Sequence, residues 1–158
     1  WEIGRRFYLT GGFALGQGDD RDTRVNETFR QTGLHDNNDK FGGVTSFRYY
    51  GELIEPELAN MQIATLGIGW KPLKRVSLDL VWHEYRQHKA SRLLVDTQLR
   101  ARPNGIDKEL GQEIDIILGW RTSKTWDLEV IGAWFGPGRA FLRRDSAVMG
   151  KVQFRYRF

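Results

Sequence analysis

The last twelve residues of the chain, Ala147 to Phe158, constrain its fold more than any other stretch. Alternate positions there differ in kind. One set is mostly apolar or aromatic (Val148, Gly150, Val152, Phe154, Tyr156, Phe158), and the other contains Lys151, Gln153, Arg155 and Arg157. A β-strand points successive side chains to opposite faces, whereas an amphipathic helix needs apolar residues three and four positions apart, a spacing that is absent here. The stretch is therefore predicted to be a strand with one apolar and one cationic face.

The same two-residue alternation returns along the rest of the chain. Strand candidates run over residues 3–16, 41–52, 62–70, 76–87, 112–121 and 126–135, with a weaker one at 27–34. With the last stretch they make about eight strands, joined alternately by short turns, near Asn37, Leu73 and Lys124, and by longer loops. A chain of 158 residues amounts to one domain. We therefore expect an all-β fold, with residues 1–158 in one antiparallel β-barrel domain or in the C-terminal segment of one.

The surroundings of this barrel depend on which face of its strands points outward. The mean hydropathy is −0.52, and no apolar run approaches the ~20 residues of a membrane-spanning helix. A transmembrane barrel can be this hydrophilic, because every second residue faces its lumen. A soluble lipocalin-like barrel is the alternative, with apolar side chains inside and charges outside. Charged residues on the second face of five strands suit a wet interior better, which favours the outer membrane of a Gram-negative bacterium with lipid as partner.

Charged and polar positions on that second face are candidates for lining a pore. We expect the following residues to line it or to contact a solute: Arg6, Arg48, Asp79, His83, Asp115, Arg121, Glu129, Lys151 and Arg155. Acidic residues on three successive strands would then face basic ones, and such a field filters solutes by charge. The alternative is that Asp127 and Glu129 pair with Lys151 and Arg155 across adjacent strands, at roughly 0.2–1 kcal/mol per pair. Arg48 has fewer acidic neighbours in the predicted strands, which favours a solute contact.

Aromatic residues gather near the predicted short turns. Trp70, Trp120 and Trp126 lie beside these turns, and Tyr156 and Phe158 end the chain. Aromatic side chains are enriched where a membrane meets water, so these five are predicted to form a membrane girdle. A last strand that ends on an aromatic residue also resembles the closing strand of outer-membrane barrels. That resemblance implies recognition of Phe158 by the barrel-assembly machinery.

Catalysis, metal binding and nucleic-acid binding find little support in the sequence. Cysteine is absent, and the three histidines, His35, His83 and His88, match no metal-ligand spacing. His83 shares a face with Asp79 and Tyr85, but no serine in a nucleophile motif accompanies them. The net charge of +4 is scattered, whereas nucleic-acid binders cluster their basic residues. We expect no enzyme activity, no metal, no cofactor and no nucleic-acid partner.

From Phe29 onward the chain resembles the C-terminal part of the alginate export family, whose members are outer-membrane barrels of eighteen strands. The resemblance lies in residues 29–34, 51–52, 57–60, 62–66, 111–115 and 135–138. It implies that the chain supplies about the last eight strands, and that periplasmic polysaccharide-export components are partners. The family lines its constriction with arginines, but Glu129 stands here where an inward arginine is expected. A long periplasmic loop of the family corresponds to the tight turn Ser123 to Thr125.

These observations predict an outer-membrane channel for a hydrophilic, charged solute. An anionic polysaccharide such as alginate, or small anions and sugars, would pass by passive diffusion through a mixed-charge lumen. The alternative is a small closed barrel that contacts a partner through its extracellular loops, above all 88–110, without transport. Eight strands filled by side chains leave no aqueous pore, so the strand number of the whole barrel separates these readings.

Overall fold

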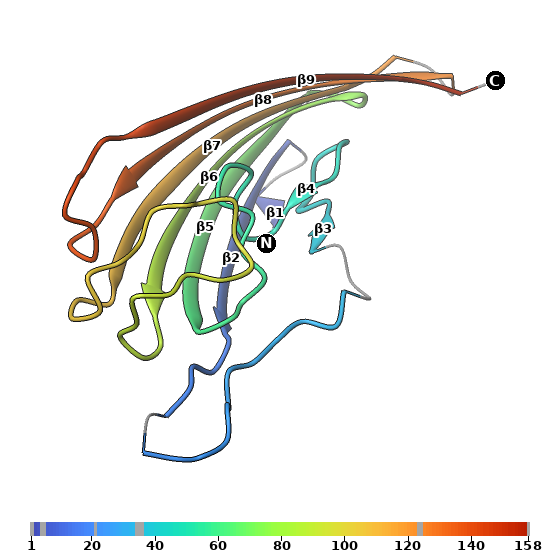
Figure 1. Ribbon diagram of the computed structural model, residues 1–158. Coiled ribbons are helices and arrows are strands. Elements are labelled where there is room, and N and C mark those ends of the chain that lie inside the picture. Colours follow the sequence, from blue (N-terminus) through green and yellow to red (C-terminus); the bar gives the residue numbers. More distant parts are fainter. Residues whose placement is uncertain (1, 4–5, 21, 34–36, 123–124, 158) are drawn as a thin grey trace.

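The computed structural model describes residues 2–3, 6–20, 22–33, 37–122 and 125–157, and it is an all-β structure (Figure 1). One curved antiparallel sheet of seven strands has the order β1-β2-β5-β6-β7-β8-β9. Its strands are β1 (Glu2–Ile3), β2 (Phe7–Leu15), β5 (Met61–Leu73), β6 (Val76–Gln87), β7 (Glu109–Arg121), β8 (Trp126–Pro137) and β9 (Ala147–Tyr156). β3 (Asn38–Asp39) and β4 (Phe47–Arg48) form a separate pair. The all-β, antiparallel prediction is confirmed.

Connections between the long strands are short at one end of the sheet and long at the other. Residues 74–75 join β5 to β6, and residues 122–125 join β7 to β8. At the opposite end the connections span residues 16–60, 88–108 and 138–146. We call the two ends the short-turn end and the long-loop end. The predicted turn near Leu73 is confirmed, whereas the turn expected at Lys124 lies outside the described residues.

The predicted strand at 41–52 is wrong, because this segment does not join the large sheet. β2 pairs directly with β5, so neither 41–52 nor the described part of 27–34 contributes a strand between them. Residues 40–58, which we call the inlay, instead lie beneath the arch of the sheet (Figure 1). Gly51 lies there at a φ of 108°, a conformation that interrupts a strand. Apart from the short β3–β4 pair, amides of the inlay bond to side chains of the large sheet, which alternation alone cannot reveal.

The two faces of the sheet have opposite chemistry. The convex face carries exposed apolar side chains, such as Leu66 at 60% and Ile116 at 52% exposure, on every long strand. On the concave face, Asp79, His83 and Asp115 are all 1% exposed or less. A water-soluble sheet would bury the first set and expose the second, so the polarity is that of a barrel in lipid. Among the described residues, no helix is long and apolar enough to cross a membrane.

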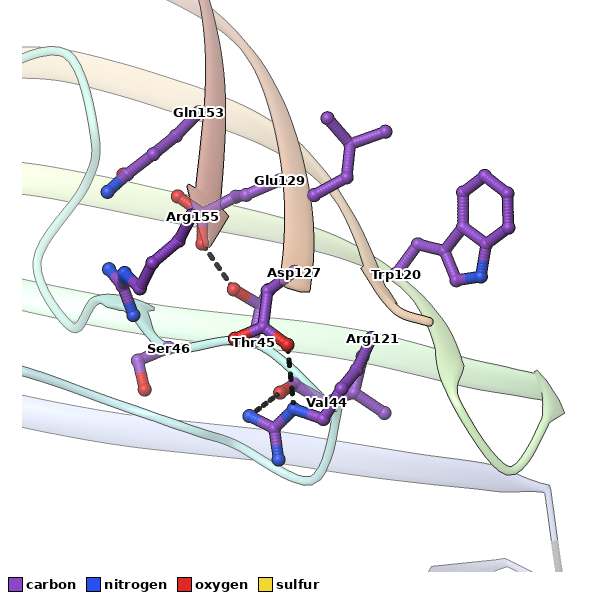
Figure 2. A pocket seen from close by; sticks show the side chains of 10 residues that line it. Val44, Thr45, Ser46, Trp120, Arg121, Asp127, Glu129, Gln153 and Arg155 are labelled. Atoms are coloured by element: carbon purple, nitrogen blue, oxygen red, sulfur yellow. Dashed lines mark hydrogen bonds and ion pairs between the residues drawn. The ribbon is translucent and has the colours of Figure 1, made fainter. Parts of the chain in front are cut away.

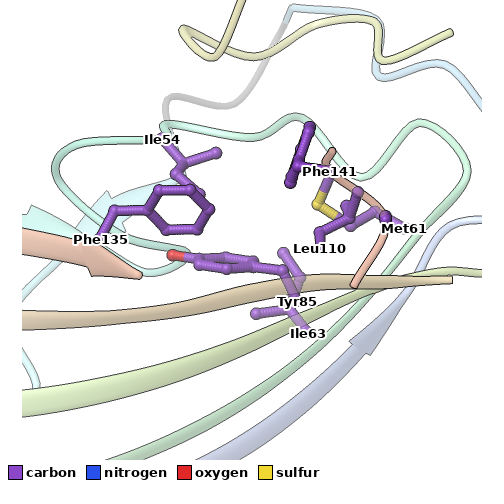
Figure 3. Close-up of a cluster of buried hydrophobic side chains, with 8 residues drawn as sticks. Ile54, Met61, Ile63, Tyr85, Leu110, Phe135 and Phe141 are labelled. Carbon is purple, nitrogen blue, oxygen red and sulfur yellow. The ribbon is translucent and has the colours of Figure 1, made fainter. Parts of the chain in front are cut away.

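Two apolar clusters attach the inlay to the concave face. At the long-loop end, Ile54 of the inlay packs with Tyr85 and Phe135 of the sheet and with Phe141 of the last loop (Figure 3). Further along, Phe47 packs against Val81, Ile117 and Ile131. Burying a side chain such as Ile54 or Phe47 stabilises by roughly 1.5–3 kcal/mol. The inlay is therefore a packed part of the fold.

Candidate functional site

Two carboxylates of β7 hold the middle of the inlay. Glu113 accepts hydrogen bonds from the amides of Leu53 (2.7 Å) and Ile54 (3.1 Å), and from the Tyr85 hydroxyl (3.1 Å). Asp115 accepts one from the amide of Glu52 at 3.2 Å. Alternation along β7 places both side chains on the concave face, where each is 0% exposed. Asp115, predicted to line the pore, therefore lies beneath the inlay.

The inlay continues across the sheet toward the short-turn end. Asp79 accepts a hydrogen bond from the Tyr8 hydroxyl, and Ser77 beside it accepts one from the amide of Val44 at 2.9 Å. Gly43 lies so close that a Cβ there would approach the Asp79 carboxylate to 2.8 Å. On β8, Glu129 accepts a hydrogen bond from the Thr45 hydroxyl. Asp79 and Glu129 are thus also covered, by residues 43–45.

His83 lies at the centre of the covered wall. Its ring is 0% exposed, with Nδ1 2.9 Å from the Thr65 hydroxyl and Nε2 3.6 Å from the Asp115 carboxylate. His83, predicted to line the pore, is therefore closed to solvent in this structure. Among the residues that the structure describes, no group of three or more acidic or histidine side chains is placed to hold a metal ion.

Arg48 lies on the inlay, and its surroundings are more acidic than expected. Its guanidinium Nε is 2.8 Å from the Glu55 carboxylate, so the expectation of few acidic neighbours is wrong. Alternation within a supposed strand could not show Glu55 folding back onto Arg48. A cavity of about 580 Å³ lies beside them, lined also by Glu57, Asp96 and the amides Asn37, Asn38 and Gln98. This cavity is more acidic than basic.

A small cavity of about 70 Å³ near the short-turn end brings together three of the predicted residues: Arg121, Glu129 and Arg155 (Figure 2). Arg121 donates to the carbonyl of Val44 (3.1 Å) and its Nε lies 3.2 Å from Asp127. Arg155 is exposed, and it forms no ion pair with another described residue. Arg155 is therefore the charged side chain in this group that remains open to a solute.

The cross-strand pairs predicted for β8 and β9 are present in part. Lys151 lies 3.7 Å from Glu129, as the pairing interpretation predicts, and also 3.4 Å from Glu52 of the inlay. Asp127 does not pair with Arg155 but with Arg121 (3.2 Å) and Arg157 (2.7 Å). Five acidic side chains of the concave face thus contact the inlay or neighbouring cations: Asp79, Glu113, Asp115, Asp127 and Glu129.

A basic group at the short-turn end joins Arg6, which the sequence analysis predicted, to Lys71 and Lys74, which it missed. Arg6 lines a cavity of about 650 Å³ together with Lys71, Pro72, Leu73 and Lys74. Lys71 lies over the ring of Tyr8, 5.5 Å from its centroid, on the concave side. None of these three cations forms an ion pair with a described residue. Their position beside a predicted short turn could have indicated from the sequence that they lie together at this end of the sheet.

The predicted girdle residues gather on the convex side at the short-turn end. Phe7 stacks on Trp70, with ring centroids 6.3 Å apart. Trp126 contacts both Trp120 (5.7 Å) and Phe154 (5.6 Å). Tyr156 is 56% exposed, whereas Phe158 lies outside the described residues. The structure thus places four of the five residues in one band.

Comparison with known proteins shows which family the chain belongs to. The family model described as alginate export matches residues 6–154. The chain belongs to the alginate export family. An alginate production protein AlgE of Azotobacter vinelandii is 32% identical over 133 residues, and that of Pseudomonas aeruginosa is 30% identical over 119. Each alignment covers 75% of this chain but only 26% and 24% of the relative. The chain therefore spans about a quarter of the length of these alginate export relatives.

Proposed function

We propose that this chain forms part of the wall of an outer-membrane channel in a Gram-negative bacterium. The channel passes an anionic polysaccharide of the alginate class by diffusion. The observation that carries the proposal is the inverted polarity of the sheet, with an exposed apolar convex face and a charged concave face. This polarity suits lipid outside and water inside. The names of the two relatives support the substrate class.

The basic group at the short-turn end supplies the electrostatic part of the mechanism. Short turns of such barrels face the periplasm, so Arg6, Lys71 and Lys74 would meet the polymer as it enters. Arg155 lies at the same end of the sheet, on β9, in the small cavity with Arg121 and Glu129. Cations without acidic partners raise the local concentration of a polyanion, and weak contacts at several sites let it move on. Arg48 contributes less to this attraction, because Glu55 neutralises it.

Two kinds of partner follow from this function. Periplasmic export components would deliver the polymer to the short-turn end. The barrel-assembly machinery would bind the C-terminal strand that ends in Phe158.

Single-channel conductance of the full gene product in a planar bilayer tests the proposal. We expect an open channel. Polyuronate added at the short-turn side should block it, whereas dextran of equal size should not. A channel indifferent to polyuronate would refute the substrate class.

A charge-reversal variant tests the residues assigned to this attraction. Arg6→Glu, Lys71→Glu and Arg155→Glu together should shift the reversal potential in a KCl gradient toward cations and weaken the polyuronate block. Arg100→Glu, in an exposed loop at the opposite end, is the matched control and should change neither. An unchanged reversal potential in the triple variant would remove these cations from the mechanism.

The inlay favours one second candidate. It fills much of the concave face, as it would in a closed barrel that contacts a partner through loop 88–110. A folded, heat-modifiable protein that never conducts would support this scaffold and refute the channel.

A further inference from the structure

The inlay separates four wall carboxylates from the space beneath the arch. Asp79, Glu113 and Asp115 are each 1% exposed or less, and the side chain of Glu129 is 14% exposed. All four point to the concave face, because they occupy alternate positions of β6, β7 and β8. Without residues 40–58 these four carboxylates would face the space beneath the arch.

We propose that the inlay is an electrostatic shield that sets the charge selectivity of the channel by covering these four carboxylates. The proposal rests on the proposed channel function and deepens it. The shield determines selectivity by hiding charges of the wall, in addition to the cations that attract the solute.

The contacts of the inlay match this role closely. Backbone amides of residues 52–54 bond to Glu113 and Asp115, the hydroxyl of Thr45 bonds to Glu129, and Gly43 covers Asp79. Uncharged donors of the inlay thus bond to three of the four carboxylates, so these contacts use no cation of the inlay. Two apolar clusters hold it down at Ile54 and Phe47.

The outward side of the inlay is close to neutral. Of its five charged residues, Glu52 is buried and faces Lys151, and Arg48 pairs with Glu55. Lys40 and Glu57, both exposed, remain and have opposite charge. The inlay therefore replaces a wall of four carboxylates by a surface with almost no net charge. An uncovered carboxylate is ionised at pH 7, and a lumen lined by acidic side chains favours cations.

Reversal potentials of the full gene product in a KCl gradient test the shield. Replacing residues 40–58 by a Gly/Ser linker of equal length should shift the preference from anions toward cations. Adding Glu113→Gln and Asp115→Asn to that variant should reverse most of the shift, which distinguishes exposed charge from a wider pore. Adding Glu84→Gln, on the convex side of β6, is the matched control and should leave the shift in place. No shift, or a shift that the double substitution does not reverse, would overturn the proposal.

A labelling experiment tests the shield without any conductance. The chain contains no cysteine, so Asp115→Cys introduces a thiol at the covered wall. A charged, membrane-impermeant thiol reagent should label it at least roughly tenfold faster when the linker replaces the inlay, because the covered position reacts only after local opening. If the linker variant does not fold, Gly51→Val takes its place, since a Cβ there would approach the Glu113 carboxylate to 2.8 Å. Equal labelling rates with and without the intact inlay would overturn the shield. A silent wild-type channel would instead overturn the proposed function.

Discussion

Glu113 is the side chain whose loss should loosen the inlay most, and the structure allows the effect to be estimated. Its carboxylate accepts hydrogen bonds from the half-buried amide of Leu53 and from the buried amide of Ile54. Glu113→Ala leaves both donors without an acceptor, at about 2 kcal/mol for the buried amide of Ile54 and about 1 kcal/mol for the half-buried amide of Leu53. The free energy of opening the inlay should therefore fall by about 3 kcal/mol, which raises the open population roughly 150-fold.

A conservative substitution should give a smaller effect of the same sign. Glu113→Gln keeps one oxygen for the amide of Leu53 but directs an NH₂ group at the amide of Ile54. The Tyr85 hydroxyl keeps its bond to the carbonyl of Tyr50, at 2.7 Å. One unsatisfied donor corresponds to about 2 kcal/mol, or a roughly 30-fold increase in opening.

Amide hydrogen exchange, read by mass spectrometry on a peptide that spans residues 51–56, measures both effects. Glu84→Gln removes a carboxylate from the convex side of neighbouring β6 and should leave exchange unchanged. Exchange that is fastest in Glu113→Ala, slower in Glu113→Gln and slowest in the wild type would show that the carboxylate holds the inlay. Equal exchange in all four proteins would refute it, because the carboxylate would then not hold the inlay.

Three further predictions address other parts of the molecule. Gly43→Val should displace the inlay and increase its cleavage by added protease, because a Cβ there would approach the Ser77 hydroxyl to 2.6 Å. Gly12→Val, with free space around it, is the control. Ile116→Arg on the exposed convex face should cost about 2–4 kcal/mol in urea unfolding from liposomes, whereas Gln153→Arg on the concave face should cost far less. Lys89 lies 2.9 Å from Asp20 and lowers the pKa of that carboxyl below its ordinary value of 3.8. The pair therefore stabilises the loops above pH 3.8, and this stabilisation is lost as the pH falls through the lowered pKa. Lys89→Ala should raise the pKa of Asp20, as measured by NMR titration.

The strands could be predicted from the sequence because alternation is a local property. β5 to β9 lie within a few residues of their predicted ranges, and Leu78, Leu80 and Ile116 point away from Asp79 and Asp115 as expected. The resemblance to the alginate export family also rests on short stretches along the chain, and the family match confirms it.

The position of the inlay could not be predicted in this way. Residues 41–52 alternate like a strand, yet the amides of Val44, Glu52 and the following Leu53 bond to side chains of the sheet. These acceptors, Ser77, Asp115 and Glu113, lie 33 to 63 positions further along the chain. Such contacts depend on how the sheet curves, and no local pattern encodes them. For the same reason the sequence could not predict the ion pair of Arg48 with Glu55 or the burial of Asp115 and His83.

Local alternation was enough to predict strands with one apolar and one charged face, because side chains alternate along any strand. The curvature of the folded sheet was needed to show that the apolar face is the convex, exposed one. It also decided which charges remain open to a solute. Arg6, Lys71 and Arg155 stay exposed or half-exposed and form no ion pair with a described residue, while the carboxylates of the wall lie under residues 40–58. The physical reason is that curvature of the sheet brings a distant segment within hydrogen-bonding distance of those carboxylates.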